Sequence, residues 1–318
     1  MLLIRAIVLL GLVPSALAYP GRQQPLTPAT SRPASPRPLV VWHGLGDTAA
    51  SEGMASIKKD IEGMYPGIFV MNVKVPGEGS LDDERKAGFW GNATDQVDIV
   101  AEKILATPEL AQGFDAIGFS QGGLFIRDYV QRYNSPPVHN LITFGSPHMG
   151  IAALIPCKSN LDVTCRLAQA AAKRGVYGKW AQDNIIQAAY FRDQDRLEEF
   201  LAANVYLTRL NGETEDQPVA RKNLARLDNY VMVMFDKDET VYPKESAIFG
   251  SLAPETHELI RMEEHDFLYK DDHIGLKTLG DLGRILVVQC AGSHMDLEWD
   301  DEDGCAKQLV KRFVGRQS

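Results

Sequence analysis

Several binding signatures are missing from this chain of 318 residues. No cluster of Lys and Arg stands out, and 33 basic residues against 42 acidic ones give a formal net charge of −9 at pH 7. A surface that binds phosphate groups needs a basic patch, so the composition argues against nucleic acid as a partner. The chain also lacks a Gly-x-x-x-x-Gly-Lys-Ser/Thr loop for a nucleotide and a His-Glu-x-x-His pair for zinc. We therefore expect neither a cofactor nor a metal ion.

Long hydrophobic runs are absent except at the N-terminus. Residues 1–18 combine Arg5, a short apolar run and the small-x-small sequence Ala16-Leu17-Ala18, which is typical of a secretory signal peptide. A membrane anchor is the alternative, but the run is short for about 30 Å of hydrocarbon. We expect a mature protein without stable membrane insertion that follows the secretory pathway to a lysosome or vacuole, or out of the cell.

Cysteine is scarce, with four residues in the chain and no Cys-x-x-Cys among them. This spacing disfavours zinc and thioredoxin-type sites. We expect the local disulfides Cys157–Cys165 and Cys290–Cys305, because these pairs close the shortest loops; free buried thiols are the alternative. In a compartment that is both oxidising and glycosylating, Asn-x-Ser/Thr sequences can carry a glycan. Asn92 begins the only such sequence without an intervening proline and is therefore the expected glycan site.

Apolar runs that alternate with helix-like segments define the rest of the chain. Residues 19–38 are rich in proline and are expected to form a linker. The expected strands are 38–42, 68–73, 114–119, 141–144, 230–235 and 284–289, and the expected helices include 57–65, 97–105, 122–133 and 309–314. This alternation predicts an α/β domain over 39–318, with a mostly parallel sheet covered by helices on both faces. Residues 151 to about 226 contain no convincing strand and are expected to form a helical insertion.

The sequence Gly118-Phe119-Ser120-Gln121-Gly122 is the strongest chemical signal. It lies between an apolar strand and a helical segment, where the nucleophile turn of an α/β-hydrolase is found. Its glycines allow a sharp backbone turn, which places the Ser120 hydroxyl at the N-terminus of a helix. The alternative is an ordinary strand–helix turn with a capping serine.

A serine nucleophile requires a histidine base oriented by a carboxylate, and α/β-hydrolases carry them in the order Ser, acid, His. Of the seven histidines, only His294 directly follows a late strand. The acid is expected after the preceding strand, where Asp236, Asp238 and Glu239 lie close together. The local pattern does not separate Asp236 from Asp238.

An oxyanion hole needs two backbone N–H donors. One is expected from Gln121, the residue after the nucleophile. The other is expected from Leu45, in the glycine-rich loop His43-Gly44-Leu45-Gly46. His43 precedes the serine in the chain, so we expect it to support this loop rather than act as the base.

Several stretches together resemble a known family: 41–47 (VWHGLGD), 118–123 (GFSQGG), 155–165, 187–193 (QAAYFRD), 231–235 with Asp238, and 292–294 (GSH). They resemble the palmitoyl-protein thioesterases of the lysosome, particularly the soluble first type, from about residue 39 to the C-terminus. The resemblance implies Asp238 rather than Asp236 as the acid, and a disulfide-bonded loop from Cys157 to Cys165. Residues 145–150 depart from the family and are closer to a segment of many lipases. Cys290 and Cys305 are not part of the family pattern, so their pairing depends on the count alone.

The resemblance implies a serine hydrolase that removes long acyl chains such as palmitoyl from cysteine thiols of S-acylated proteins or peptides. It also implies that the helical insertion provides the groove for the acyl chain. A secreted lipase or carboxylesterase with the same triad, acting on oxygen esters, is the alternative. An inactive hydrolase fold that serves as a carrier is a third reading, and the intact Ser, Asp and His argue against it.

Overall fold

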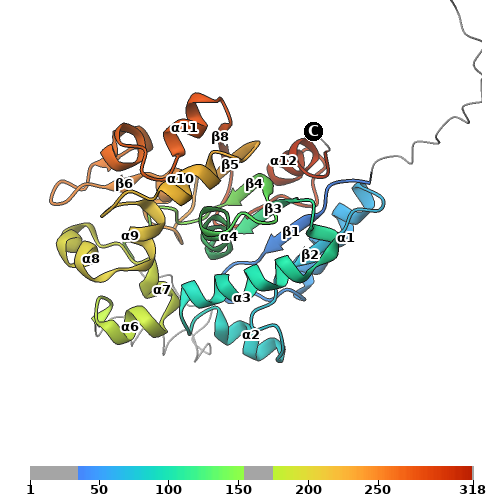
Figure 1. Cartoon of the computed structure of the whole chain (residues 1–318), viewed down its shortest axis with the longest axis horizontal. Coiled ribbons are helices and arrows are strands. Elements are labelled where there is room, and N and C mark those ends of the chain that lie inside the picture. The colour runs from blue at the N-terminus through green and yellow to red at the C-terminus, as the bar shows by residue number, and fades with distance from the viewer. Residues whose placement is uncertain (1–34, 154–174, 317–318) are drawn as a thin grey trace, which may run out of the picture. The chain divides into compact units, whose positions relative to one another are not determined.

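A six-stranded parallel sheet forms the centre of the computed structural model, which describes residues 35–153 and 175–316 (Figure 1). The strand order is β2-β1-β3-β4-β5-β8, and every neighbouring pair is parallel. The strands are β1 (Leu39–Trp42), β2 (Val70–Asn72), β3 (Phe114–Phe119), β4 (Val138–Phe144), β5 (Asn229–Phe235) and β8 (Ile285–Cys290). The predicted α/β fold with a mostly parallel sheet is confirmed. The expected signal peptide, Cys157 and Cys165 lie outside the described residues.

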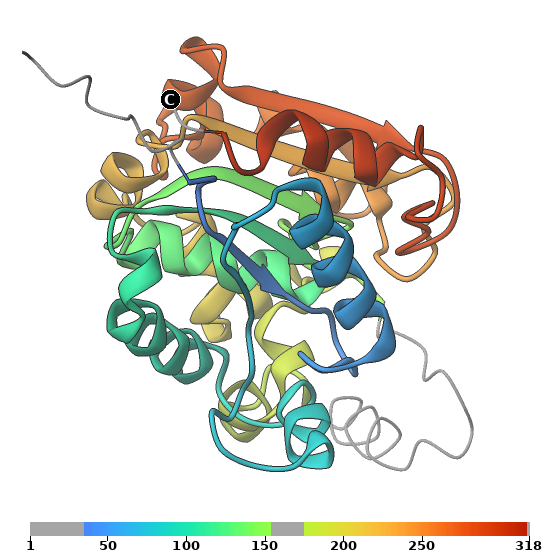
Figure 2. The ribbon, with the colours of Figure 1, turned by 90° about the vertical axis from the view of Figure 1, so that its right-hand side faces the viewer.

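Helices cover both faces of the sheet because its strands are apolar on both sides. Along β1, Val40 and Trp42 enter one apolar core, whereas Leu39 and Val41 enter the other. The first core is completed by α3 (Ala93–Ala106), α4 (Gln121–Arg132), α10 (Pro218–Leu224) and α11 (Leu276–Asp281). The second is completed by α1 (Glu52–Met64) and α12 (Cys305–Phe313), which lie side by side on one face in Figure 2.

Short helices fill residues 175–226, the described part of the expected insertion between β4 and β5. They are α6 (Lys179–Asn184), α7 (Ile186–Ala189), α8 (Leu197–Ala203), α9 (Tyr206–Asn211) and α10. No strand of the main sheet occurs in this described part. The buried side chains of α7, α9 and α10 join the same core as α4, so these helices pack on the face of the sheet that carries α4.

Some elements have no expected counterpart in the sequence. Helix α2 (Leu81–Ala87) buries only Glu84, so it lacks an apolar stripe, but Ser80 and Asp83 form a capping box at its N-terminus. The hairpin of β6 (Ser251–Leu252) and β7 (Leu259–Ile260) is too short for a periodic pattern. Among the described residues, no helix has the length and apolar character needed to cross a bilayer.

A buried carboxylate joins both ends of the described chain at the edge of the sheet where the strands begin. Asp115, at the start of β3, is 1% exposed and accepts hydrogen bonds from Arg37 (3.0 Å), Asn140 Nδ2 (2.8 Å) and Gly315 N (2.9 Å). The Gly315 carbonyl in turn accepts a hydrogen bond from Arg37 N. Arg37, which the proline content places in a linker, is therefore anchored to the domain.

Candidate active site

Ser120 lies in a tight turn between β3 and α4, at φ 50° and ψ −122°. This conformation is rare for a non-glycine residue and is found at functional sites. The neighbouring glycines are required by close backbone approach: a Cβ on Gly118 would lie 2.6 Å from Gly123 N, and one on Gly122 would lie 2.5 Å from His43 O. The glycines that the motif supplies therefore allow the serine to stand at the carboxyl end of the sheet.

Three side chains far apart in the sequence form one hydrogen-bonded chain. His294 Nε2 lies 3.0 Å from Ser120 Oγ, and His294 Nδ1 lies 2.6 Å from Asp238 Oδ2. The other carboxylate oxygen, Asp238 Oδ1, accepts hydrogen bonds from the backbone N–H groups of Thr240 (2.9 Å) and Val241 (3.0 Å). These two bonds fix the carboxylate toward the imidazole, so the histidine is oriented as a nucleophile's base requires.

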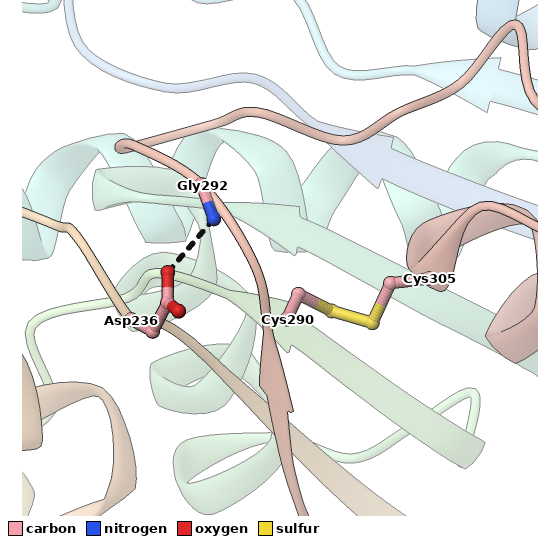
Figure 3. Close-up of a disulfide and its surroundings, with 4 residues drawn as sticks. All are labelled: Asp236, Cys290, Gly292 and Cys305. Carbon is pink, nitrogen blue, oxygen red and sulfur yellow. Dashed lines mark hydrogen bonds between the residues drawn. A yellow bond between two sulfur atoms is a disulfide. The ribbon is translucent and has the colours of Figure 1, made fainter.

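Asp236, the alternative acid, has a different partner. Its Oδ1 accepts a hydrogen bond from Gly292 N at 2.8 Å, and Lys237 N donates to Gly292 O at 3.0 Å. Figure 3 shows this contact beside the disulfide that joins Cys290 to Cys305, whose Cα atoms are 5.8 Å apart. The segment that carries His294 is therefore tied to the end of β5 on one side and to the start of α12 on the other.

Both expected oxyanion donors lie near Ser120. Within the described residues, neither Leu45 N–H nor Gln121 N–H donates a hydrogen bond to a protein atom. The loop that carries Leu45 approaches the nucleophile closely, because a Cβ on Gly44 would lie 3.2 Å from Ser120 Cβ. Two free N–H groups at this place suit an oxygen that becomes negatively charged.

The loop before Leu45 is supported by a residue that local patterns did not single out. Glu84 is 1% exposed, and its Oε1 lies 3.2 Å from His43 Nε2 and accepts a hydrogen bond from Ala49 N at 2.8 Å. His43 thus contacts α2 and not the nucleophile. Only the capping box of α2 could have drawn attention to Glu84 from the sequence.

A second histidine lies behind the site without joining the chain of three. His148 is fully buried, and its Nε2 is 3.0 Å from both Thr143 Oγ1 and Tyr230 OH. Burial and the nearby Arg127 guanidinium hold the pKa of His148 well below its usual range, so its imidazole stays neutral. Segment 145–150, which departs from the family pattern, therefore supplies a buried structural histidine rather than a base.

Within residues 35–153 and 175–316, no three His, Cys, Asp or Glu side chains are grouped so that they could hold a metal ion. The described residues bring a serine hydroxyl, an imidazole, a carboxylate and two backbone N–H groups together at this place.

A family model described as palmitoyl protein thioesterase matches residues 38–294, which is more than half of the chain. This chain belongs to the palmitoyl protein thioesterase family. The matched residues contain the turn at Ser120, the loop at Leu45, Asp238 and His294. The matched residues end at His294, so helix α12 and Cys305 lie beyond the stretch that the family model matches.

Three relatives match this chain along most of their own length. Palmitoyl-protein thioesterase 1 of Caenorhabditis elegans is 35% identical over 262 residues, which cover 82% of this chain and 87% of that protein. Palmitoyl-protein thioesterase 3 of Dictyostelium discoideum is 31% identical, covering 83% and 87%. Lysosomal thioesterase PPT2 of Homo sapiens is 29% identical, covering 83% and 82%.

Solved structures show a more distant likeness. The structure titled "RedJ with PEG molecule bound in the active site" covers 94% of this chain and is itself covered to 95%, with a TM-score of 0.42 and 16% sequence identity. The fold of the present protein is defined by its own sheet order and helices.

Loss of the Cys290–Cys305 disulfide should weaken both the fold and the site. The bridge spans 15 residues, and closing a loop of that length stabilises by roughly 3 kcal/mol when chain entropy dominates. We expect the double variant Cys290→Ser/Cys305→Ser to show a lower melting temperature and a lower kcat, because His294 lies inside the closed loop. Calorimetry and steady-state kinetics measure the two effects. Peptide mapping of non-reduced protein that found free thiols at both positions would contradict the premise.

The two aspartates after β5 should differ in their effect on turnover. Asp238→Asn should lower kcat on the order of 10⁴-fold, because the imidazole tautomer is no longer fixed. Asp236→Asn is a matched control, since it removes the same charge two residues away and keeps an oxygen that can accept from Gly292 N. We expect a far smaller loss for this control. A reversed ranking in kcat would show that the acid is misassigned.

Proposed function

We propose that this protein is a serine hydrolase that cleaves long-chain acyl thioesters, such as palmitoyl, from cysteine residues of S-acylated proteins or peptides. The observation that carries the proposal is the hydrogen-bonded chain of Ser120, His294 and Asp238 in a member of the palmitoyl protein thioesterase family. The three relatives described above are named thioesterases, and two of them are named palmitoyl-protein thioesterases.

The first half-reaction transfers the acyl group to the enzyme. Ser120 Oγ attacks the thioester carbonyl carbon while His294 Nε2 accepts the hydroxyl proton. The carbonyl oxygen becomes an oxyanion that the N–H groups of Leu45 and Gln121 stabilise. The C–S bond then breaks, the imidazolium gives its proton to the departing cysteine sulfur, and the acyl group remains on Ser120 as an ester.

The second half-reaction releases the fatty acid. His294 removes a proton from water, whose oxygen attacks the acyl-enzyme carbonyl, and the same N–H groups stabilise the second oxyanion. The ester bond breaks, Ser120 recovers its proton from His294, and the free fatty acid leaves. Asp238 remains ionised throughout and stabilises the imidazolium that forms in each half. Helices α6 to α10, in the described part of the insertion, provide the apolar groove for the acyl chain in this proposal.

The same proposal places the protein in the secretory pathway, with a lysosome as destination. A disulfide suits an oxidising compartment, and a relative is named a lysosomal thioesterase. Asn92 fits a glycan: its Oδ1 caps α3 by accepting from Thr94 N at 2.8 Å, and the half-buried side chain keeps Nδ2 for the sugar.

Protein secreted from a glycosylating host should therefore lose mass when an N-glycosidase is added. Asn92→Gln should abolish that loss, because no other sequon without proline is present in the chain. Mass spectrometry of both proteins makes the measurement. An unchanged mass for the wild-type protein would remove the glycan from the proposal.

Ser120→Ala should abolish formation of the acyl-enzyme while leaving the fold intact. Removal of one member of a triad leaves only about 10³- to 10⁴-fold catalysis over water. The measurement is hydrolysis of acyl thioesters of graded chain length by both proteins, with oxygen esters of the same acyl chains as a second series. Activity of the variant within tenfold of wild type would remove Ser120 from the nucleophile's role. Preference of the wild type for oxygen esters would replace thioesterase by lipase or carboxylesterase.

A further inference from the structure

The side chain of Gln121 has a specific environment that the mechanism above does not use. Its amide is almost fully buried, with the residue 4% exposed. Oε1 accepts a hydrogen bond from Tyr190 OH at 2.9 Å, and Nε2 donates to Gly88 O at 3.2 Å. Each end of the amide therefore holds a different segment of the chain, while the backbone N–H of the same residue donates to no protein atom within the described residues.

Tyr190 comes from the helices between β4 and β5 and is held firmly there. Its ring is fully buried, and its backbone carbonyl accepts a hydrogen bond from Ile151 N at 3.0 Å. A Cβ on Gly150 would lie only 2.6 Å from this carbonyl, so the two backbones are in close contact. Burial raises the pKa of the Tyr190 phenol, so the hydroxyl keeps its proton and acts as the donor to Gln121.

Gly88, the residue that follows α2, contacts the loop that carries the other expected donor, Leu45 N–H. A Cβ on Gly88 would lie 3.3 Å from Gly46 N and 3.7 Å from Leu45 Cδ1, so the end of α2 packs directly against the loop that carries Leu45 N–H. Through its two hydrogen bonds, the Gln121 amide connects this packed segment to Tyr190. The Gln121 amide is thus bonded to the segment that packs against the loop of Leu45, and Gln121 itself carries the other proposed donor N–H.

We propose that Tyr190 is a positioning residue for the oxyanion hole, acting through its hydrogen bond to the Gln121 side chain. The inference extends the proposed function, because it assumes that Leu45 N–H and Gln121 N–H stabilise an oxyanion formed at Ser120. In this role Tyr190 acts through Gln121 and takes no part in the reaction itself. It holds the Gln121 amide so that both donors keep the distance and direction that the transition state requires.

Removal of the Tyr190 hydroxyl leaves the buried Gln121 Oε1 without a hydrogen-bond donor. An unsatisfied buried acceptor costs free energy, so the amide is expected to rotate toward another donor. Rotation of the Gln121 side chain would disturb the Gly88 contact as well. Because oxyanion donors act on the transition state, displacement lowers kcat and leaves substrate binding unchanged. Complete loss of such a donor typically costs about 10²- to 10³-fold, so a displaced one is expected to cost about tenfold.

The test is Tyr190→Phe, with Tyr206→Phe as its matched control. Tyr206 is in α9 of the same group of helices and is 5% exposed, and its buried hydroxyl has no hydrogen-bond partner within the described residues. We expect Tyr190→Phe to lower kcat about tenfold on a short-chain and a long-chain acyl thioester alike, with KM within twofold of wild type. We expect Tyr206→Phe to stay within twofold of wild type in both constants.

A role in the wall of an acyl groove would give a different pattern. In that case KM would rise on the long-chain thioester only, and this result would overturn the inference. Unchanged kcat in a folded Tyr190→Phe protein would overturn it as well. Gln121→Met removes the same hydrogen bond from its acceptor side. The double variant Gln121→Met/Tyr190→Phe should therefore lose no more kcat than Gln121→Met alone. Additive losses would show that Tyr190 acts by another path.

A fluorophosphonate probe separates this inference from the proposed thioesterase activity. Ser120 Oγ attacks the phosphorus, fluoride leaves and the hydroxyl proton passes to His294, so the reaction needs the oxyanion hole but no thioester. We expect labelling by Tyr190→Phe to be about tenfold slower than labelling by wild type and by Tyr206→Phe. Slower labelling in an enzyme that hydrolyses no thioester would support the positioning role and contradict the proposed substrate. Equal labelling rates in an active thioesterase would contradict the positioning role alone. Absence of labelling in the wild type would overturn both.

Discussion

Backbone contact around Ser120 is the constraint on which the rest of the site depends. The glycines two residues before and after Ser120 lie so close to their neighbours that side chains are excluded, with Gly118 against Gly123 and Gly122 against the carbonyl of His43. This contact forces β3, β1 and the first turn of α4 together at one point. The serine, the loop with Leu45 and the end of β4 must then meet there. A parallel sheet adds the remaining groups, because the carboxyl ends of its strands share the same edge.

The sequence predicts those parts of the site that follow directly from strand ends. Ser120 follows an apolar strand, and His294 follows the last one, so both can be placed at the same edge from local patterns. The choice between Asp236 and Asp238 does not follow from the position of a strand end. Both follow β5, and only the path of the chain after Phe235 decides that Asp238 turns toward the imidazole while Asp236 turns toward Gly292. Family resemblance, rather than the pattern around these residues, selected between them.

The supporting roles of Glu84 and Tyr190, unlike that of His43, could not have been found this way. Glu84 and His43 are 41 residues apart, and Tyr190 and Gln121 are 69 residues apart. A hydrogen bond between remote segments leaves no periodicity in either one. Helix α2 also lacks the apolar stripe that reveals the longer helices, since its one buried side chain is a carboxylate. Sequence patterns thus describe the framework of this fold, whereas the contacts that hold the loop with Leu45 in place come from packing between remote segments.

The anchoring of Arg37 and Gly315 to Asp115 has a practical consequence for handling this protein. Asp115 is at the beginning of β3 and Ser120 is just past its end, so the described chain begins and ends at the edge of the sheet that faces away from the nucleophile. A tag or surface linker joined near Arg37 or near Gly315 would lie at that remote edge of the sheet. Immobilised molecules would then present Ser120 outward, toward a substrate supplied from solution.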